Sequence, residues 1–425
     1  MPDRTLPEAL VHWTIVLTWL FYAVGGLYVA GPVLVWTLGA LAALSLFLGP
    51  ALGPTLRAAG PVPPLAVAWI VGMAVMLVAL WIGHLQWDLG AAMLIKSTVG
   101  WAKGWAMIAV LITAGAVLPI RRGVLVRAQC GLAAVTLSVL PGLLVAPLLG
   151  LPPKLFTSPL EVVGGPGPEY FSVYLYTIDP EVGAARWQFY APWSPFAGML
   201  GVAIILFALE EPRHGRRLLG HLAGLAMIFL SASRMSLVAL VVCFALPRLA
   251  PFAGRAGTWI AAAVAAAALA VVGPLVATIV DDAIRSFNGA RASSSRVRSL
   301  LQQIAWNRWQ SEAIWFGHGT VERGPHMVEF MPIGSHDTWY GLLFVKGVFG
   351  VVALAVPMIW HFAVTLGDAV RGPRGRLPFG LMLLLTILTF GENLEIEIYL
   401  FWPAFLLLGI HLREMEGRSP SPAVA

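Results

Sequence analysis

Charged residues are scarce in this chain. Asp, Glu, Lys and Arg together make up 11% of its 425 residues, against roughly a quarter in a soluble globular domain. Hydrophobic residues make up 59%, and a soluble core cannot bury that much apolar surface in a chain of this length. The sequence therefore predicts an integral membrane protein, in which lipid covers the remaining apolar side chains.

Cysteines and short catalytic motifs are also scarce. Cys130 and Cys243 fall in separate apolar runs, so we expect neither a disulfide framework nor a C-x-x-C metal site. The chain has no Gly-rich phosphate loop, no G-x-S-x-G sequence and no H-E-x-x-H sequence. The acid pair Asp281-Asp282 lacks a third ligand at a suitable spacing, and we expect no metal. The net charge of +6 is not gathered in a basic cluster with interleaved aromatic residues, so nucleic acid is not an expected partner.

Twelve runs of mostly apolar residues approach the length of about 20 residues that a helix needs to cross a membrane. They lie at 10–29, 32–49, 64–84, 101–120, 124–148, 194–210, 216–233, 236–251, 258–280, 338–362, 377–391 and 394–411. No small-residue cleavage site follows the first run, so we interpret it as a retained helix. The sequence therefore predicts an all-α, polytopic membrane protein with about 12 transmembrane helices, in which residues 1–425 form a single membrane domain.

Basic residues in the short loops predict the orientation of these helices, because Lys and Arg favour the cytoplasmic side. With both termini in the cytoplasm, every short basic cluster falls on that side: Arg57; Arg121, Arg122 and Arg127; Arg213, Arg216 and Arg217; Arg248 and Arg255; Arg371, Arg374 and Arg376. The outer side then receives residues 86–100, the loop 150–193, the large loop 281–337 and the turn at Glu392.

The loop 281–337 departs from this charge bias. It holds six arginines on the outer side: Arg285, Arg291, Arg296, Arg298, Arg308 and Arg323. Either these arginines pair with acidic residues of the same loop (Asp281, Asp282, Glu312, Glu322 and Glu329), or some of them hold an anionic ligand at the membrane surface. Residues 299–315 have apolar side chains at about helical spacing and three tryptophans, which predicts an amphipathic helix in the membrane interface.

Arg234 and His336 are the first candidates for chemistry. Arg234 follows Ser233 between two apolar runs, where an arginine either snorkels to the interface or has a function. Its planar guanidinium suits phosphate oxygens. His336 lies where the loop 281–337 meets the next helix, and imidazole can exchange a proton near neutral pH, although a lone histidine is more often structural. The neighbouring Asp337 is expected to cap that helix.

Acidic residues gather in a second outer turn, which contains Glu392, Glu395 and Glu397. Carboxylates so close to lipid need partners, and arginines are available on the same side. Either these residues form a salt-bridge network, which we favour, or one of them contacts a substrate. Lys346, inside the helix that follows His336, is expected to make an interior polar contact.

Several motifs follow one another in a distinctive order. SASRMSLVAL places Ser-Arg at a helix end, an arginine-bearing segment then ends in Trp315-Phe316-Gly317-His318-Gly319, and His336-Asp337-Thr338-Trp339 leads to Lys346-Gly347-Val348-Phe349-Gly350. This set resembles the O-antigen ligase and polysaccharide polymerase superfamily of GT-C-type membrane glycosyltransferases. The resemblance covers about 230–350 directly, and the helix count agrees with it. Where the family commonly has His-Asn, this chain has His-Asp.

The resemblance implies an enzyme of the bacterial inner membrane with a periplasmic active site. Its donor would be a glycan linked through pyrophosphate to undecaprenol, and it would use no nucleotide sugar, metal or cofactor. The acceptor would be a second lipid-linked repeat unit in a polymerase of exopolysaccharide, capsule or O-antigen, or lipid A–core in a ligase. A flippase and a chain-length regulator are partners expected of such a system.

The resemblance also implies roles for individual residues. Arg234 and His336 would be catalytic, with Arg234 on the pyrophosphate and His336 beside the acceptor hydroxyl. One arginine of the pair Arg296 and Arg298 would also bind the pyrophosphate, and the register leaves either possible. Arg186 falls where the family often has another arginine. Glu392 and Arg308 are supporting residues.

Three functions remain open at this point. The phrase SHDTWYGLL around His336 looks more like exopolysaccharide polymerases, so we favour a polymerase over a ligase. A transporter of lipid-linked glycans is the third alternative. It would be expected to show repeated halves and polar residues near the membrane midplane, whereas this chain shows no obvious internal repeat and its charges gather at the outer side.

Overall fold

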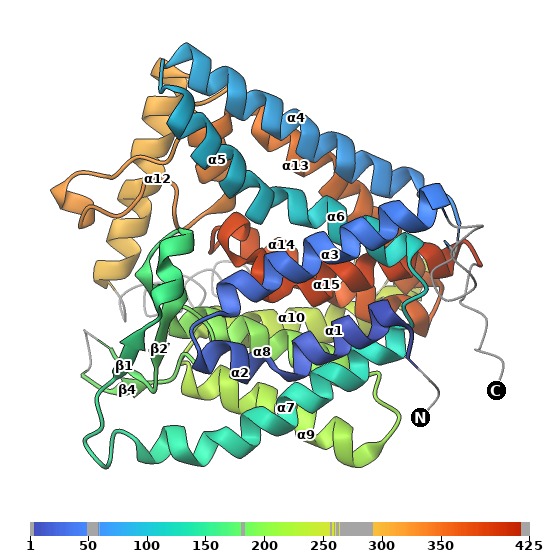
Figure 1. Cartoon of the computed structure of the whole chain (residues 1–425). Helices are drawn as coiled ribbons and strands as arrows, with labels where there is room; N and C mark the ends of the chain where they lie inside the picture. Colours follow the sequence, from blue (N-terminus) through green and yellow to red (C-terminus); the bar gives the residue numbers. More distant parts are fainter. Residues whose placement is uncertain are drawn as a thin grey trace.

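Helices make up most of the protein. The computed structural model describes residues 4–48, 58, 60–179, 183–255, 257, 258, 260, 263 and 292–417. In this part of the chain the helices pack side by side, and strands occur only in the connection between α7 and α8 (Figure 1). The all-α class predicted from the sequence is therefore confirmed.

Seven helical segments among the described residues are long and apolar enough to cross a membrane. They are α3 (Leu27–Leu48), α4 (Pro64–Gln86), α5 (Ala91–Lys103) with α6 (Trp105–Val117), α7 (Arg122–Val145), α10 (Arg234–Leu249) with the 3₁₀ turn η3 (Ala250–Gly254), α13 (Thr338–Arg371) and α15 (Leu394–Met415). These segments coincide with seven of the twelve expected runs.

Four other expected runs form shorter helices. The run 10–29 is divided between α1 (Leu6–Val16), α2 (Thr18–Ala23) and the start of α3. The runs 194–210, 216–233 and 377–391 become α8 (Ser194–Ala208), α9 (His214–Leu230) and α14 (Arg376–Thr389), with the 3₁₀ turn η5 (Pro373–Gly375) before α14. Most of the run 258–280 lies outside the described residues. Twelve spanning helices therefore remain a prediction.

The helices α6, α8 and α15 form the centre of the structure, because most of their side chains are buried on every face. The backbones of α6 and α15 approach closely where each carries a glycine. A β-carbon on Gly115 would lie 2.3 Å from the carbonyl oxygen of Leu406, and one on Gly409 would lie 2.1 Å from that of Ile112. Small residues permit this close packing between apolar helices in lipid, where the hydrophobic effect does not drive them together.

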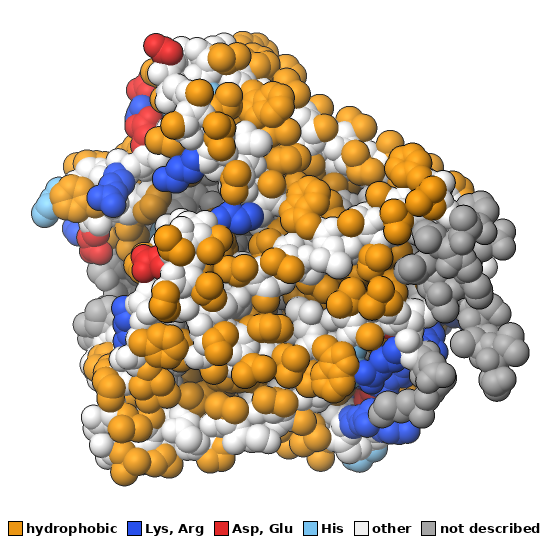
Figure 2. Space-filling view, viewed as in Figure 1, with side chains coloured by type: hydrophobic (Ala, Val, Ile, Leu, Met, Phe, Trp, Pro, Cys, Tyr) orange, Lys and Arg blue, Asp and Glu red, His pale blue; other side chains and the backbone are white. Residues whose placement is uncertain are grey.

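Apolar side chains also cover much of the outer surface. Val33, Phe47 and Val241 are each more than half exposed, although side chains of this kind are normally buried in a soluble protein. On the face shown in Figure 2, charged side chains gather mainly towards the left edge and the lower right, with a largely apolar area between them. This distribution is the one expected of a protein whose helices are surrounded by lipid.

The connection between α7 and α8 is folded onto one end of the helices. It contains two antiparallel strand pairs, β1 (Lys154–Thr157) with β2 (Ser172–Tyr174) and β3 (Thr177–Ile178) with β4 (Ala185–Arg186), and the 3₁₀ turns η1 (Pro159–Val163) and η2 (Pro168–Phe171). The Tyr22 hydroxyl donates to the Tyr174 carbonyl oxygen at 3.1 Å and accepts from its N–H at 2.8 Å. The Trp187 indole donates to the Leu143 carbonyl oxygen at 2.8 Å. The described residues of the loop 150–193 are therefore held against the helices by these hydrogen bonds.

The helix α13 is interrupted at Gly347, where φ is +62° and ψ is −160°. An interruption leaves backbone groups without their helical partners, and in a membrane these groups need partners from the protein. The segment 314–319, which follows α12 (Ala292–Glu312), supplies them. The hydrogen bonds run from His318 to Phe344 (2.8 Å), from Gly319 to Val345 (2.9 Å), from Val348 to Ile314 (3.0 Å) and from Phe349 to Trp315 (3.2 Å).

Glycine is required on both sides of this junction. Gly317 and Gly347 both have φ in the left-handed region. A β-carbon on Gly317 would lie 2.4 Å from the Val345 carbonyl carbon, and one on Gly347 would lie 2.3 Å from the backbone of Trp315. The glycines of the motifs Gly317-His318-Gly319 and Gly347-Val348-Phe349-Gly350 thus allow the segment after α12 to pack against the interruption in α13.

Gly347→Ala should lower the free energy of unfolding, because a side chain with left-handed φ costs about 1–2 kcal/mol and the new β-carbon would overlap Trp315. The measurement is the thermal midpoint of the purified protein in detergent. Gly367→Ala is the matched control in the same helix, since a β-carbon there meets nothing within 4 Å and alanine favours a helix. Equal midpoints for the two variants would contradict this account of the junction.

Candidate functional site

Two helices, α13 and α15, begin beside each other at the turn that contains Glu392. The Thr338 hydroxyl donates to the Glu392 carbonyl oxygen at 2.7 Å and accepts from the Leu394 N–H at 2.9 Å. One residue further, the Trp339 indole donates to the Thr389 hydroxyl at 3.1 Å. The start of α13 is therefore locked to the turn between α14 and α15.

The helices α8 and α10 begin at the same place. Met235, at the start of α10, lies against the Glu392 turn, since a β-carbon on Gly391 would be 2.3 Å from its Cε. On α8, a β-carbon on Gly198 would be 2.4 Å from the Ser236 hydroxyl oxygen. Four helix N-termini thus surround one turn, and each N-terminus carries partial positive charge from its exposed N–H groups. The first residues of these helices are Ser194, Arg234, Thr338 and Leu394.

Arg234 is the first residue of α10. Ser233 caps the helix, because its hydroxyl oxygen accepts from the Ser236 N–H at 3.3 Å. The preceding Ala232 has φ +51°, which turns the chain sharply between α9 and α10. Arg234 is partly exposed at this turn, where the sequence placed it at a helix end.

Arg186, on β4 in the loop 150–193, reaches the turn between α9 and α10. Its Nη2 donates to the Ser231 carbonyl oxygen at 3.0 Å, and its Nη1 donates to Asp179 Oδ2 at 3.2 Å. The neighbouring Trp187 N–H donates to the Leu230 carbonyl oxygen at 3.1 Å. The structure therefore brings Arg186 next to the residues that lead into Arg234. Asp179 was not identified from the sequence, although an acid seven residues before an arginine in a hairpin is a usable signal.

Arg298, and not Arg296, faces the Glu392 turn. Its Nη2 lies 4.0 Å from Glu392 Oε1, whereas Arg296 is exposed. Two positions that differ by two residues point to different sides of a helix. Of these two arginines, Arg298 is therefore the one that lies at the Glu392 turn, and its contact with a pyrophosphate stays a prediction.

His336 and Asp337 lie at the start of α13, next to Arg298. Asp337 caps the helix as predicted, because its Oδ1 accepts from the N–H groups of Trp339 (2.8 Å) and Tyr340 (3.0 Å). His336 Nε2 lies 3.3 Å from Met331 Sδ, and its Nδ1 is buried with no hydrogen-bond partner among the described residues. Burial, together with the charge of Arg298, lowers the pKa of His336 to about 4.

Glu392 occupies the centre of this arrangement and is 4% exposed. One carboxyl oxygen lies near Arg298, and the other, Oε2, has no hydrogen-bond partner among the described residues. Burial raises the pKa of Glu392 to about 7, against the lowering effects of Arg298 and of the nearby Trp193 side chain. Trp193 directly precedes α8.

Arg308 lies in a different environment. Its guanidinium pairs with Glu312 at 2.9 Å and with Glu322 at 2.5 Å, and it stacks over the ring of Phe344. Lys346 is buried and pairs with Glu395 at 3.4 Å, as expected of an interior polar contact. Both ion pairs strengthen the scaffold around the site. The structure does not bring Arg308 into contact with Glu392 or His336 in the described part of the chain.

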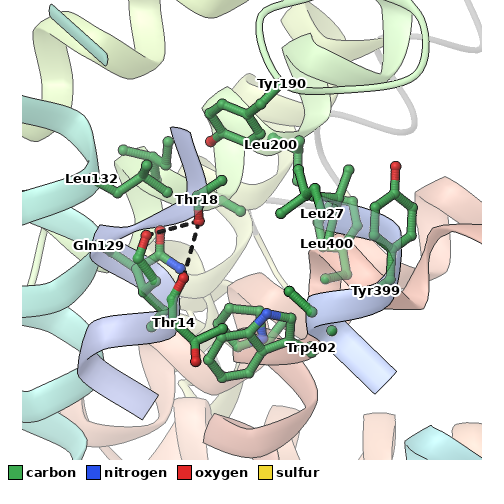
Figure 3. A pocket seen from close by; sticks show the side chains of 18 of the residues that line it. Thr14, Thr18, Leu27, Gln129, Leu132, Tyr190, Leu200, Tyr399, Leu400 and Trp402 are labelled. Atoms are coloured by element: carbon green, nitrogen blue, oxygen red, sulfur yellow. Dashed lines mark hydrogen bonds between the residues drawn. The ribbon is translucent and has the colours of Figure 1, made fainter. Parts of the chain in front are cut away.

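A separate cavity lies between α1, α3, α7, α8 and α15 (Figure 3). Its polar lining includes Thr14, Thr18, Gln129 and Tyr190, and the Thr18 hydroxyl donates to the Ile15 carbonyl oxygen at 2.8 Å. A volume of about 40 Å³ leaves room for water and not for a substrate. The Glu392 turn is therefore the stronger candidate for a functional site.

No protein-family model matches this chain, and no curated protein matches it at a significant level. Within the described residues, no group of three or more His, Cys, Asp or Glu side chains is placed to hold a metal ion. Arg298 and several helix N-termini lie around Glu392, and Arg186 and Arg234 lie at the neighbouring turn into α10; such groups suit an anion.

Glu392→Gln should change how stability depends on pH. Because the pKa of Glu392 is raised from 4.5 to about 7 in the folded protein, its contribution is present below pH 4.5 and is lost as pH rises to about 7, by about 3 kcal/mol at most. Glutamine resembles the protonated acid, so the variant should gain in thermal midpoint over the wild type between pH 5 and pH 8.

Glu312→Gln is a control for which the opposite dependence of stability on pH is expected. The guanidinium of Arg308 lowers the pKa of Glu312, so this carboxylate adds stability above its ordinary pKa and loses it as the solution becomes more acidic. That variant should lose midpoint relative to the wild type at pH 8. If the Glu392→Gln variant changes the thermal midpoint equally at pH 5 and pH 8, Glu392 does not titrate between these pH values and the raised pKa is wrong.

Proposed function

We propose that this protein is a membrane glycosyltransferase that polymerises glycan repeat units carried on undecaprenyl pyrophosphate. The observation that carries the proposal is that two neighbouring turns hold three arginines from separate elements. Arg186 and Arg234 lie at the turn into α10, and Arg298 lies beside Glu392 and His336 at the Glu392 turn, which Met235 of α10 contacts. Arginine can donate two parallel N–H bonds to phosphate oxygens, and the surrounding helix N-termini add positive potential. A lipid-linked pyrophosphate is the anion that best fits such a cluster at the end of membrane helices.

The reaction needs stabilisation of a leaving group. The acceptor hydroxyl forms a bond to the anomeric carbon of the donor sugar, the bond from that carbon to the pyrophosphate oxygen breaks, and its electron pair leaves with undecaprenyl pyrophosphate. Arginines held in place before the reaction stabilise the negative charge that develops there. They supply the positive charge that a divalent cation supplies in other enzymes, so the proposal includes no metal and no cofactor. Direct displacement inverts the anomeric carbon.

The proton of the acceptor hydroxyl needs a base. His336 has a pKa of about 4, so its imidazole is neutral at pH 7 and can accept a proton at Nδ1, which has no partner among the described residues. A positioned base of this kind contributes about 10²–10⁴-fold. Glu392, with a pKa of about 7, is the second group that can receive the proton. Both lie beside Arg298, on which we place the pyrophosphate.

The proposed location is the bacterial inner membrane, with both termini in the cytoplasm and the site at the periplasmic face. Seven apolar helical segments support a multi-pass protein, and the positive-inside distribution of short basic loops supports this orientation. The loops 150–193 and 281–337 would then carry Arg186, Arg298 and His336 on the periplasmic side. The partners we propose are the lipid-linked donor, a glycan acceptor, a flippase and a chain-length regulator.

Two alternatives share parts of this site. An O-antigen ligase would use the same arginines with lipid A–core as acceptor, and no described residue distinguishes it from a polymerase. A transporter is favoured by one observation, the interrupted helix α13, since interrupted helices often form transport sites. Here, however, four hydrogen bonds with the segment 314–319 pair backbone groups at the interruption, which argues against a transport site there.

The assay that tests the proposal uses the purified protein and a defined undecaprenyl-pyrophosphate oligosaccharide. We expect longer lipid-linked chains, formed in the presence of a chelator, and no such product from His336→Ala. Transfer only to added lipid A–core would identify a ligase. If neither product forms, and His336→Ala cells still make normal polymer, the glycosyltransferase proposal is wrong.

Arg298 and Arg296 provide a matched pair for the pyrophosphate site. Arg298→Ala should reduce the rate by about 10²–10³-fold, because it removes a charged donor from the developing negative charge. Arg296→Ala removes an exposed arginine from the same helix and should leave the rate within about twofold. Equal rates for both variants, with equal thermal midpoints, would contradict the assignment of Arg298.

A further inference from the structure

An apolar groove lies between α9 and α10, on the outer surface of the helices. Both helices pack against α8, whose last turn forms the floor of the groove with Ile205 and Leu209. Leu225 of α9 lines one side, and Val241 and Phe244 of α10 line the other. The volume is about 400 Å³, within the range of about 300–1,000 Å³ found for ligand pockets. The groove is open at the surface, since Val241 is 66% exposed.

The groove lies at the end of the helices away from the Glu392 turn. The Trp187 N–H donates to the Leu230 carbonyl oxygen, so α9 ends beside β4, on the proposed periplasmic side. In Figure 1, α9 runs from the side where α7 begins to the side of the strands. Val241 and Phe244 are about 10–15 Å along α10 from Arg234, at 1.5 Å per residue. In the proposed orientation the groove therefore faces the cytoplasmic leaflet.

Arginines flank the cytoplasmic end of the groove. On α9, Arg217, His221 and Leu225 follow one another at intervals of four residues and so lie on one face of the helix. On α10, the guanidinium carbon of Arg248 lies 3.6 Å from the centre of the Phe244 ring, and its Nη1 donates to the Phe244 carbonyl oxygen at 2.8 Å. Because His221, Leu225 and Phe244 line the groove, both arginines lie at its mouth.

The charges of these two arginines are not balanced by carboxylates. Arg217 Nη2 lies 3.4 Å from His214 Nδ1, and neither Arg217 nor Arg248 forms an ion pair with any residue that the structure describes. The acids at the end of α8 have partners of their own. Glu210 pairs with an arginine of α7 at 3.2 Å, and Glu211 accepts a hydrogen bond from a backbone N–H at 3.1 Å. The mouth of the groove is therefore positively charged.

We infer that this groove binds an anionic phospholipid of the cytoplasmic leaflet, with one acyl chain along the groove and the phosphate at Arg217 and Arg248. An acyl chain suits the apolar lining, and guanidinium groups suit phosphate oxygens. A third arginine, Arg376 at the start of α14, adds positive charge near Arg248. A headgroup with an ammonium group would meet like charge there, so the site selects lipids of net negative charge. The site is separate from the Glu392 turn and does not depend on the proposed function.

The experiment is native mass spectrometry of the full-length, delipidated protein, which measures the dissociation constant of the most tightly bound lipid. The probes are dioleoylphosphatidylglycerol, dioleoylphosphatidylcholine, glycerol 3-phosphate and undecaprenyl phosphate. We expect phosphatidylglycerol to bind at least about 10-fold more tightly than phosphatidylcholine, because each arginine favours the anionic headgroup by about 5-fold. Glycerol 3-phosphate should bind at least about 100-fold more weakly than phosphatidylglycerol, because it has no acyl chain to bury.

Arginine variants test the mouth of the groove. Arg217→Ala and Arg248→Ala should each weaken binding of phosphatidylglycerol about 5-fold. Arg216→Ala is the matched control, because Arg216 is adjacent in sequence but its charge acts on His12 and Cys130, which belong to α1 and α7. This control should leave the dissociation constant within about twofold.

Tryptophan variants test the groove itself. Val241→Trp places a large side chain in the groove and should weaken binding of phosphatidylglycerol at least about 10-fold. Val238→Trp is its control on the same helix, since Val238 is also more than half exposed and is not part of the lining. Binding of undecaprenyl phosphate should be the same in Val241→Trp as in the wild type.

Three results would overturn the inference. Equal affinities for phosphatidylglycerol and phosphatidylcholine, or for Arg217→Ala and Arg216→Ala, would show that only ordinary surrounding lipid binds there. If glycerol 3-phosphate binds as tightly as phosphatidylglycerol, the groove is not used. If Val241→Trp weakens binding of undecaprenyl phosphate as much as that of phosphatidylglycerol, the groove holds a prenyl chain instead. Thermal midpoints establish that the variants are folded, and the pair Arg217→Ala and Arg216→Ala decides the result if Val241→Trp is destabilised.

Discussion

The hydrogen bonds that close the interruption in α13 are the constraint on which the rest of the site depends. A helix broken at Gly347 cannot leave its backbone groups unpaired in an apolar environment, so the segment 314–319 must lie beside it. This segment is continuous with α12, and its position fixes where α12 can run. As a result Arg298, on α12, lies near His336 and Glu392 at the start of α13 and α15. A structural requirement of the scaffold therefore sets the geometry of the candidate site.

Charge balance explains how these cationic groups can lie near one another. Arginines and helix N-termini at neighbouring turns repel one another, and burying them without compensation is costly. Glu392 compensates Arg298, and Asp179 compensates Arg186. Under the proposed function, a pyrophosphate would compete with these carboxylates for the same guanidinium groups. The high pKa of Glu392 means that it can give up its charge when an anion arrives.

Much of the local structure could be predicted from the sequence, because it depends on neighbouring residues. Asp337 caps α13, Lys346 makes a buried polar contact, and seven apolar runs form long helices. The choice between Arg296 and Arg298 could not be predicted, because it depends on how α12 is rotated against α15. The ion-pair partners of Arg308 could not be predicted either. The sequence grouped this arginine with the site, whereas the fold pairs it with Glu312 and Glu322.

Composition and periodicity alone determined that this is an all-α protein with helices suited to lipid, since these properties follow from how much apolar surface the chain carries and how that surface repeats. The motif order also indicated which residues to consider. Only the tertiary structure decided that Arg298 lies beside Glu392 and that Arg186 reaches the Ser231 carbonyl oxygen at the turn into α10. The reason is physical: helix formation is governed by residues a few positions apart, whereas the meeting of four helix N-termini depends on packing among elements up to two hundred residues apart.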